Sequence, residues 1–136
     1  MPAPAARPAS IVAAIAADVV LVVVFAAIGR ASHDESVDAA GVWATAWPFL
    51  VGLAVGWIAV RGWRRPLAVR STGVASWLAT VIVGMLLRLA TGAGAAVAFV
   101  IVATVTLALF LLGWRAVAAL ARRSRSRARR DAAVAP

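Results

Sequence analysis

Four long apolar segments constrain this chain more than any other feature of its sequence. They run from about residues 10–29, 43–61, 73–91 and 95–115. Each is close to the roughly 20 residues that a helix needs to cross a hydrocarbon core of about 30 Å. Backbone groups inside lipid find no water to bond, so such segments must be helical. The sequence therefore predicts an all-α, integral membrane four-helix bundle over residues 10–120, after an N-terminal arm of residues 1–9.

The arginines are distributed unequally between the two ends of these segments. One end, with the acidic residues Asp34, Glu35 and Asp38, holds only Arg30 and Arg88. Cationic loops are retained in the cytoplasm. We therefore expect a multi-pass protein of the cell (plasma) membrane with both termini cytoplasmic. The twelve arginines assigned to the cytoplasmic end are Arg7, Arg61, Arg64, Arg65, Arg70, Arg115, Arg122, Arg123, Arg125, Arg127, Arg129 and Arg130.

The C-terminal residues 121–136 form a strongly basic segment. Six arginines lie between Arg122 and Arg130. Runs of like charge are typical of disordered extensions, and basic segments beside a membrane contact anionic lipid. We predict a disordered tail whose partner is the lipid bilayer. Nucleic acid is not an expected partner, despite the net charge of +9.

Small residues on the second and third segments predict where helices pack closely. Gly52 and Gly56 form a GxxxG pattern, which lets a neighbouring backbone approach. Trp77, Thr80, Gly84 and Arg88 recur at spacings of three and four residues, so they share one face of the third segment. We expect Gly52, Gly56 and Gly84 to pack inside the bundle, with a homodimer interface as the alternative for the GxxxG pair.

Asp18 is the most informative polar residue because it lies in the middle of the first apolar segment. A lone carboxylate near the centre of a bilayer costs about 2.5–3.5 kcal/mol on insertion scales, so it must face the interior, find a partner or be protonated. Counted along their helices, Thr80, Thr104 and Thr106 lie at a similar depth. The long side chain of Arg88 could reach down to Asp18 or equally extend outward to the acidic loop. We predict an interior polar cluster of these five residues. Asp18 would either hold helices together or exchange a proton or cation.

The sequence gives little support for catalysis. Cysteine is absent, and the single histidine lies in the acidic loop. No nucleophile–base set, paired carboxylates or glycine-rich phosphate loop is present. We therefore expect no enzymatic activity, no cofactor and no metal site.

Several short stretches together form a recognisable pattern. They are Asp18; Gly29, Arg30 and His33; Trp47, Pro48, Phe49, Gly52, Gly56 and Trp57; Trp77, Thr80, Gly84, Met85 and Arg88; and Gly113, Trp114 and Arg115. With these residues the chain resembles a family of small four-span membrane proteins from bacteria and archaea, common in actinobacteria, which is known as domain of unknown function 3054. The resemblance implies the four-span topology and marks the same polar positions, but it assigns no activity, ligand or catalytic residue.

Two functional hypotheses follow from these residues. The first is a small proton- or cation-linked carrier or channel-like protein that uses Asp18 as its titratable site. The second is an accessory or scaffolding subunit that binds a larger membrane complex through Gly52 and Gly56.

Overall fold

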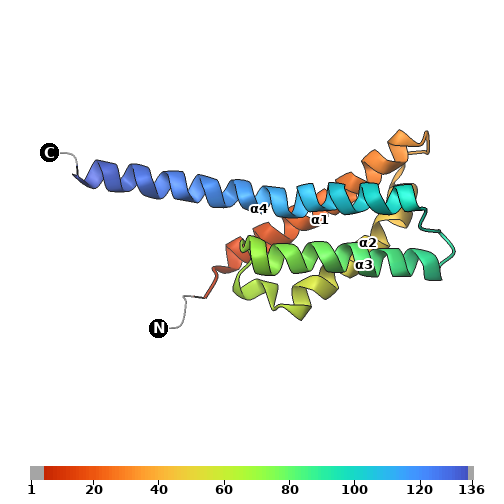
Figure 1. The fold of residues 1–136 in the computed structure, drawn as a ribbon, viewed down its shortest axis with the longest axis horizontal. Helices are drawn as coiled ribbons and strands as arrows, with labels where there is room; N and C mark the ends of the chain where they lie inside the picture. Colours follow the sequence, from red (N-terminus) through yellow and green to blue (C-terminus); the bar gives the residue numbers. More distant parts are fainter. Residues whose placement is uncertain (1–4, 135–136) are drawn as a thin grey trace.

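Four helices, each long and apolar enough to cross a membrane, make up most of the computed structural model, which describes residues 5–134 (Figure 1). No β-strand occurs within these residues, in agreement with the predicted all-α class. The helices are α1 (Pro8–Ser32), α2 (Ala39–Ala59), α3 (Val74–Ala90) and α4 (Val97–Val134). The third apolar span, Val69–Ala90, consists of α3 and the helical turn that precedes it. A short 3-10 turn, η1 (Gly62–Arg64), and a π-helical turn, η2 (Val69–Gly73), connect α2 to α3.

The first two helices have clear start signals. Pro8 occupies the beginning of α1, where its fixed φ suits a helix and its missing N–H is not needed. Asp38 caps α2 by accepting a hydrogen bond of 2.7 Å from the Gly41 amide. This bond is the largest cause of a pKa of Asp38 below its usual value, and a hydrogen bond from the Ser36 hydroxyl is the second. The cap is therefore present at neutral pH and weakens as the pH falls through the lowered value.

The last helix departs from the sequence prediction. A helix of about 95–115 and a disordered tail of 121–136 were expected, whereas α4 continues without a break to Val134 and extends well beyond the other helices (Figure 1). The segment is rich in alanine and arginine, which are strong helix formers. Like-charge repulsion is therefore outweighed by intrinsic propensity. Residues 1–4 and 135–136, parts of the predicted arm and tail, lie outside the described residues.

Close backbone contact joins α2 to α3. A Cβ atom on Gly52 would lie 2.6 Å from the Ala79 carbonyl oxygen, and one on Gly56 would lie 2.8 Å from the Ala75 carbonyl oxygen. Gly84, on α3, faces the ring of Phe49 in the same way. Only glycine allows these two helices to lie so near, and the close approach increases dispersion contact between them.

Aromatic packing fills the end of the bundle near the α1–α2 and α3–α4 connections. Phe25 and Phe49 meet edge to face with ring centroids 5.2 Å apart. Phe99 of α4 lies 6.2 Å from Phe49. Edge-to-face pairs of this kind contribute about 0.5–1.5 kcal/mol beyond the area that they bury. The cluster therefore ties α1, α2 and α4 together at this end.

Replacing Gly56 with alanine tests the α2–α3 contact. The new methyl group would meet backbone atoms of α3, so we expect Gly56→Ala to destabilise the fold by about 1–3 kcal/mol. Gly113→Ala is the matched control, because a Cβ at Gly113 has no neighbour within 4 Å. This control should be neutral or stabilising by up to about 1 kcal/mol through helix propensity. Unfolding of the purified protein in detergent, followed by circular dichroism, measures both changes. Equal stability of the two variants would contradict the close contact.

Candidate functional site

The candidate site is centred on Asp18, which belongs to the inward face of α1. The buried residues of this helix are spaced so that they share one face: Ala14, Asp18, Val22, Phe25 and Ala26. The Asp18 side chain is 0% exposed. The apolar pattern of α1 therefore carries a carboxylate into the bundle along with its hydrophobic neighbours.

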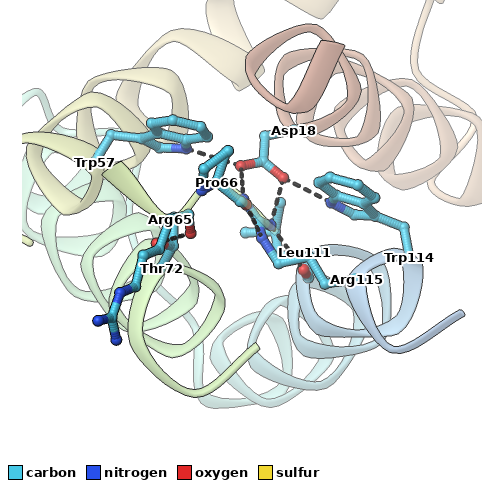
Figure 2. A network of polar contacts seen from close by, with 8 residues as sticks. All are labelled: Asp18, Trp57, Arg65, Pro66, Thr72, Leu111, Trp114 and Arg115. Carbon is cyan, nitrogen blue, oxygen red and sulfur yellow. Dashed lines mark hydrogen bonds and ion pairs between the residues drawn. The ribbon is translucent and has the colours of Figure 1, made fainter. Parts of the chain in front are cut away.

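Both oxygens of the Asp18 carboxylate are saturated by hydrogen-bond donors (Figure 2). Arg115 of α4 binds it in bidentate fashion, with Nη1 2.7 Å from Oδ1 and Nη2 2.7 Å from Oδ2. The indole N–H of Trp114 donates to Oδ1 at 2.8 Å, and that of Trp57 donates to Oδ2 at 2.8 Å. Each oxygen thus accepts two bonds. Four donors with no acceptor among them fit an ionised carboxylate.

The guanidinium of Arg115 is enclosed as completely as its partner. Its side chain is also 0% exposed. Nε donates to the Pro66 carbonyl at 3.0 Å, and Nη1 donates to the Leu111 carbonyl at 2.9 Å. The guanidinium carbon also lies 4.6 Å from the centroid of the Trp114 ring, which is within the range of a cation–π interaction. The positive charge therefore has partners on several sides.

The energetic consequence of this arrangement is asymmetric. Moving a charged group from water into an apolar interior costs several kcal/mol, and a bidentate pair with further hydrogen bonds offsets that cost. Removing one partner leaves the other charge buried without compensation, which typically costs about 3–5 kcal/mol. The pair of Asp18 and Arg115 is thus built to remain intact rather than to open and close.

Arg88 does not serve as the partner of Asp18, which the sequence analysis considered. It lies near the C-terminal end of α3, where Nε and Nη2 donate to the carbonyls of Gly94 and Ala93 at 3.0 and 3.1 Å. Its guanidinium carbon is 4.4 Å from the centroid of the Phe99 ring. A long basic side chain near a helix end loses less conformational entropy by bonding to nearby loop carbonyls than by reaching a distant carboxylate. Arg88 therefore closes the α3–α4 connection.

The three threonines expected near Asp18 take other roles. Thr80 is buried on the face of α3 that meets α2, and among the described residues its hydroxyl has no hydrogen-bond partner. Thr104 donates to the Val100 carbonyl of its own helix at 2.6 Å, while its backbone carbonyl accepts a bond of 2.9 Å from the Trp77 indole. Thr106 is half-buried. The predicted five-residue polar cluster is therefore not formed around Asp18.

Sequence reasoning missed Arg115 and the donor role of Trp57 and Trp114. Arg115 was counted among the twelve arginines assigned to the cytoplasmic end, and Trp57 and Trp114 were named only as positions that match the family. A usable signal was present: the buried residues of α4 are Ala103, Leu107, Leu111 and Arg115, at strict four-residue spacing. Extending that apolar stripe by one turn leads to the arginine.

No group of three or more His, Cys, Asp or Glu side chains comes together within residues 5–134 in a way that could hold a metal ion. The other acidic residues near a basic partner lie in the α1–α2 connection, where Arg30 and Glu35 form an ion pair of 2.8 Å. Arg30 also donates to the Ser36 carbonyl at 2.7 Å. This connection is a hydrogen-bonded turn, and its polar groups largely satisfy one another.

Substituting one indole tests the contribution of the neutral donors. In Trp57→Phe the ring is largely kept, but a buried carboxylate loses one bond, and hydrogen bonds to charged groups contribute about 1.5–3 kcal/mol. We expect a loss of about 2 kcal/mol in the free energy of unfolding. Trp63→Phe is the control, because Trp63 is 44% exposed. Denaturant unfolding in detergent measures both variants, and equal losses would show that the bond from Trp57 contributes nothing specific.

Comparison with known proteins assigns the family of this chain. No curated protein and no solved structure matches it. Residues 15–118 match the family described as "Protein of unknown function (DUF3054)". The matched region contains all four side chains of the site, from Asp18 to Arg115. The chain belongs to the DUF3054 family.

Proposed function

We propose that this chain is a four-span protein of the cell (plasma) membrane with both termini in the cytoplasm. The two termini and the α2–α3 connection lie toward the same end of the bundle (Figure 1). Arg115 is buried in the ion pair, so eleven arginines remain at that end, against Arg30 and Arg88 at the other. The positive-inside rule supports a cytoplasmic location for the basic end. The eleven are Arg7, Arg61, Arg64, Arg65, Arg70, Arg122, Arg123, Arg125, Arg127, Arg129 and Arg130.

Within that membrane we propose an accessory or scaffolding role in a larger complex rather than a carrier role. The observation that carries this proposal is the saturation of Asp18. A carboxylate that exchanges protons or cations needs a free acceptor position and a path to water, whereas all four bonds of Asp18 are made and both charges are 0% exposed. We infer that Asp18 stabilises the bundle. The function is then to be sought on the surface of the protein, and we propose no catalytic activity.

The surface used for a partner must differ from the one that the sequence indicated. Gly52 and Gly56 face α3 of the same chain at contact distance, so another protein cannot bind there without displacing α3. The part of α4 that projects beyond the other helices, residues 117–134, is available instead. We call it the projecting part of α4. The 38 residues of α4 extend about 57 Å at 1.5 Å per residue, which is about 27 Å more than a hydrocarbon core requires.

The projecting part of α4 has two distinct sides. Val117, Leu120, Ala121, Ser124 and Ala128 follow one side at helical spacing, and all are exposed. Asp131 lies on the same surface, which Arg123 and Arg127 border. The other arginines occupy most of the rest of the circumference. We propose that the arginine side contacts anionic lipid and that the side of small and apolar residues contacts a helix of the partner complex. Small residues favour close helix–helix packing.

Photo-crosslinking in native membranes tests this accessory role. A photoreactive amino acid at Ala121 or Ala128 should give a discrete crosslinked product. The matched control is Ser126, which is exposed on the opposite side of the same helix and should give none. The purified chain reconstituted in vesicles should show no proton or cation flux that depends on Asp18.

Two results would contradict the proposal. The first is equal crosslinking from Ala128 and Ser126, which would indicate no defined interface. The second is a pH-dependent flux in vesicles that Asp18→Asn abolishes while the variant stays folded. This second result would favour the carrier hypothesis instead.

A further inference from the structure

A basic recess lies beside the α2–α3 connection, at the same end of the bundle as the chain termini. Its volume is about 640 Å³, which is within the range of pockets that hold small ligands. Arg61, Arg64 and Arg65 line one part of it, and we call these three the loop arginines. The apolar residues Ile11, Val60 and Trp63 line another part. The recess therefore combines concentrated positive charge with an apolar wall.

The charge of the loop arginines is not neutralised within the chain. The sequence contains five acidic residues. Asp18 is bound to Arg115, and three others lie in the α1–α2 connection at the opposite end of the bundle. The fifth, Asp131, lies on the projecting part of α4. Among the described residues the loop arginines form no ion pair. Adjacent like charges without a counter-ion favour binding of an anion.

Hydrogen bonds from buried side chains hold the backbone of the loop arginines in place. The Thr72 hydroxyl donates to the Arg65 carbonyl at 2.7 Å, and Arg115 Nε donates to the Pro66 carbonyl at 3.0 Å. Figure 2 shows both contacts beside the Asp18 carboxylate. Gly62 packs so tightly on the Trp57 ring that an added Cβ would lie 2.7 Å from it. A site whose backbone is fixed in advance loses less entropy when a ligand binds.

A neighbouring recess continues the basic surface toward α4. It has a volume of about 410 Å³ and is lined by Arg65 and Arg122, among others. Arg65 therefore lies on the border of both recesses, and Arg122 comes from the beginning of the projecting part of α4. The positive region extends over three segments of the chain: η1, the loop that follows it, and α4.

We propose that this recess is a binding site for the phosphate group of an anionic phospholipid. Arginine binds phosphate through several directed hydrogen bonds, and the loop arginines supply the donors. Trp63 and Val60 are 44% and 41% exposed, and together with Ile11 they offer an apolar surface to the glycerol and acyl portion. This apolar wall favours a lipid over free phosphate. In the orientation proposed above, the recess lies at the cytoplasmic end of the bundle, so the lipid would belong to the inner leaflet. That assignment rests on the proposed orientation, whereas the binding site itself does not.

Two triple variants with the same change in charge test the proposal. The first, Arg61→Gln/Arg64→Gln/Arg65→Gln, removes the loop arginines, whose side chains are exposed and form no ion pair within residues 5–134. The second, Arg123→Gln/Arg127→Gln/Arg129→Gln, removes three charges from the projecting part of α4. The full-length proteins are reconstituted in nanodiscs of phosphatidylcholine and phosphatidylglycerol, and lipid retained on release is measured by native mass spectrometry.

The proposal predicts that the wild type retains phosphatidylglycerol in preference to phosphatidylcholine. The α4 variant loses only the diffuse attraction of three exposed arginines for anionic lipid, so it should keep most of that preference. The loop variant should lose that preference by about tenfold or more, because it lacks the guanidinium groups that donate directed hydrogen bonds to the lipid phosphate. Equal loss in both triple variants would overturn the proposal, because diffuse attraction would then explain binding. A second result would also overturn it: inorganic phosphate alone binds as strongly as the lipid, and the loop variant loses this binding. The site would then belong to a soluble anion.

Orientation is tested separately, so that the two proposals can fail independently. The chain has no cysteine, so a single Val37→Cys or Ser126→Cys variant can be labelled with a membrane-impermeant maleimide in intact cells. Labelling at residue 126 would overturn the inner-leaflet assignment and leave the recess intact as a lipid site. Labelling at residue 37 alone would support the inner leaflet as the source of the lipid.

Discussion

Asp18 and Arg115 place two full charges at a point in the bundle where both side chains are 0% exposed. In such surroundings either charge alone would be strongly destabilising, and the two together are tolerated only because every strong hydrogen-bonding position around the carboxylate is filled. Because hydrogen bonds are directional, this requirement also fixes how the helices are placed relative to one another. Apolar helices in a bundle can slide and rotate against one another at little cost, whereas a bidentate ion pair with two indole donors specifies one register.

The contacts of this pair reach most of the fold. Asp18 belongs to α1, Trp57 to α2, and Arg115 to α4, and the Arg115 Nε also fixes the loop at Pro66. The remaining helix, α3, is positioned differently, through glycine-mediated contact with α2 and the bond from the Trp77 indole to α4. The basic end of the bundle is thus fixed by polar contacts, and the opposite end by aromatic packing. A rigid basic end provides the support that both the projecting α4 and the recess of the loop arginines need.

Apolar length alone was sufficient to predict four helices, because the backbone has no alternative partner in lipid. The partner of Asp18 could not be predicted in the same way. Arg115 is 97 residues away in the sequence. Its position at the end of the fourth apolar segment suggested a flanking role, which its four-residue spacing from the buried Leu111 contradicts. Arg88 is isolated in an apolar segment, which made it a candidate partner for Asp18. It instead donates hydrogen bonds to carbonyls of the neighbouring α3–α4 connection. The helical course of α4 to Val134 was also missed, because charge density was weighed above alanine and arginine propensity.

A double-mutant cycle between Asp18 and Arg115 tests the central claim most directly. The variants Asp18→Asn, Arg115→Gln and the combination of both are compared with the wild type by denaturant unfolding in detergent. Because each single variant strands a buried charge, we expect each to lose about 3–5 kcal/mol, and the double variant to lose far less than the sum of the two. A coupling energy of several kcal/mol would confirm that the charges stabilise each other inside the bundle. Losses that add to within about 0.5 kcal/mol would show that they do not interact, and would contradict the account.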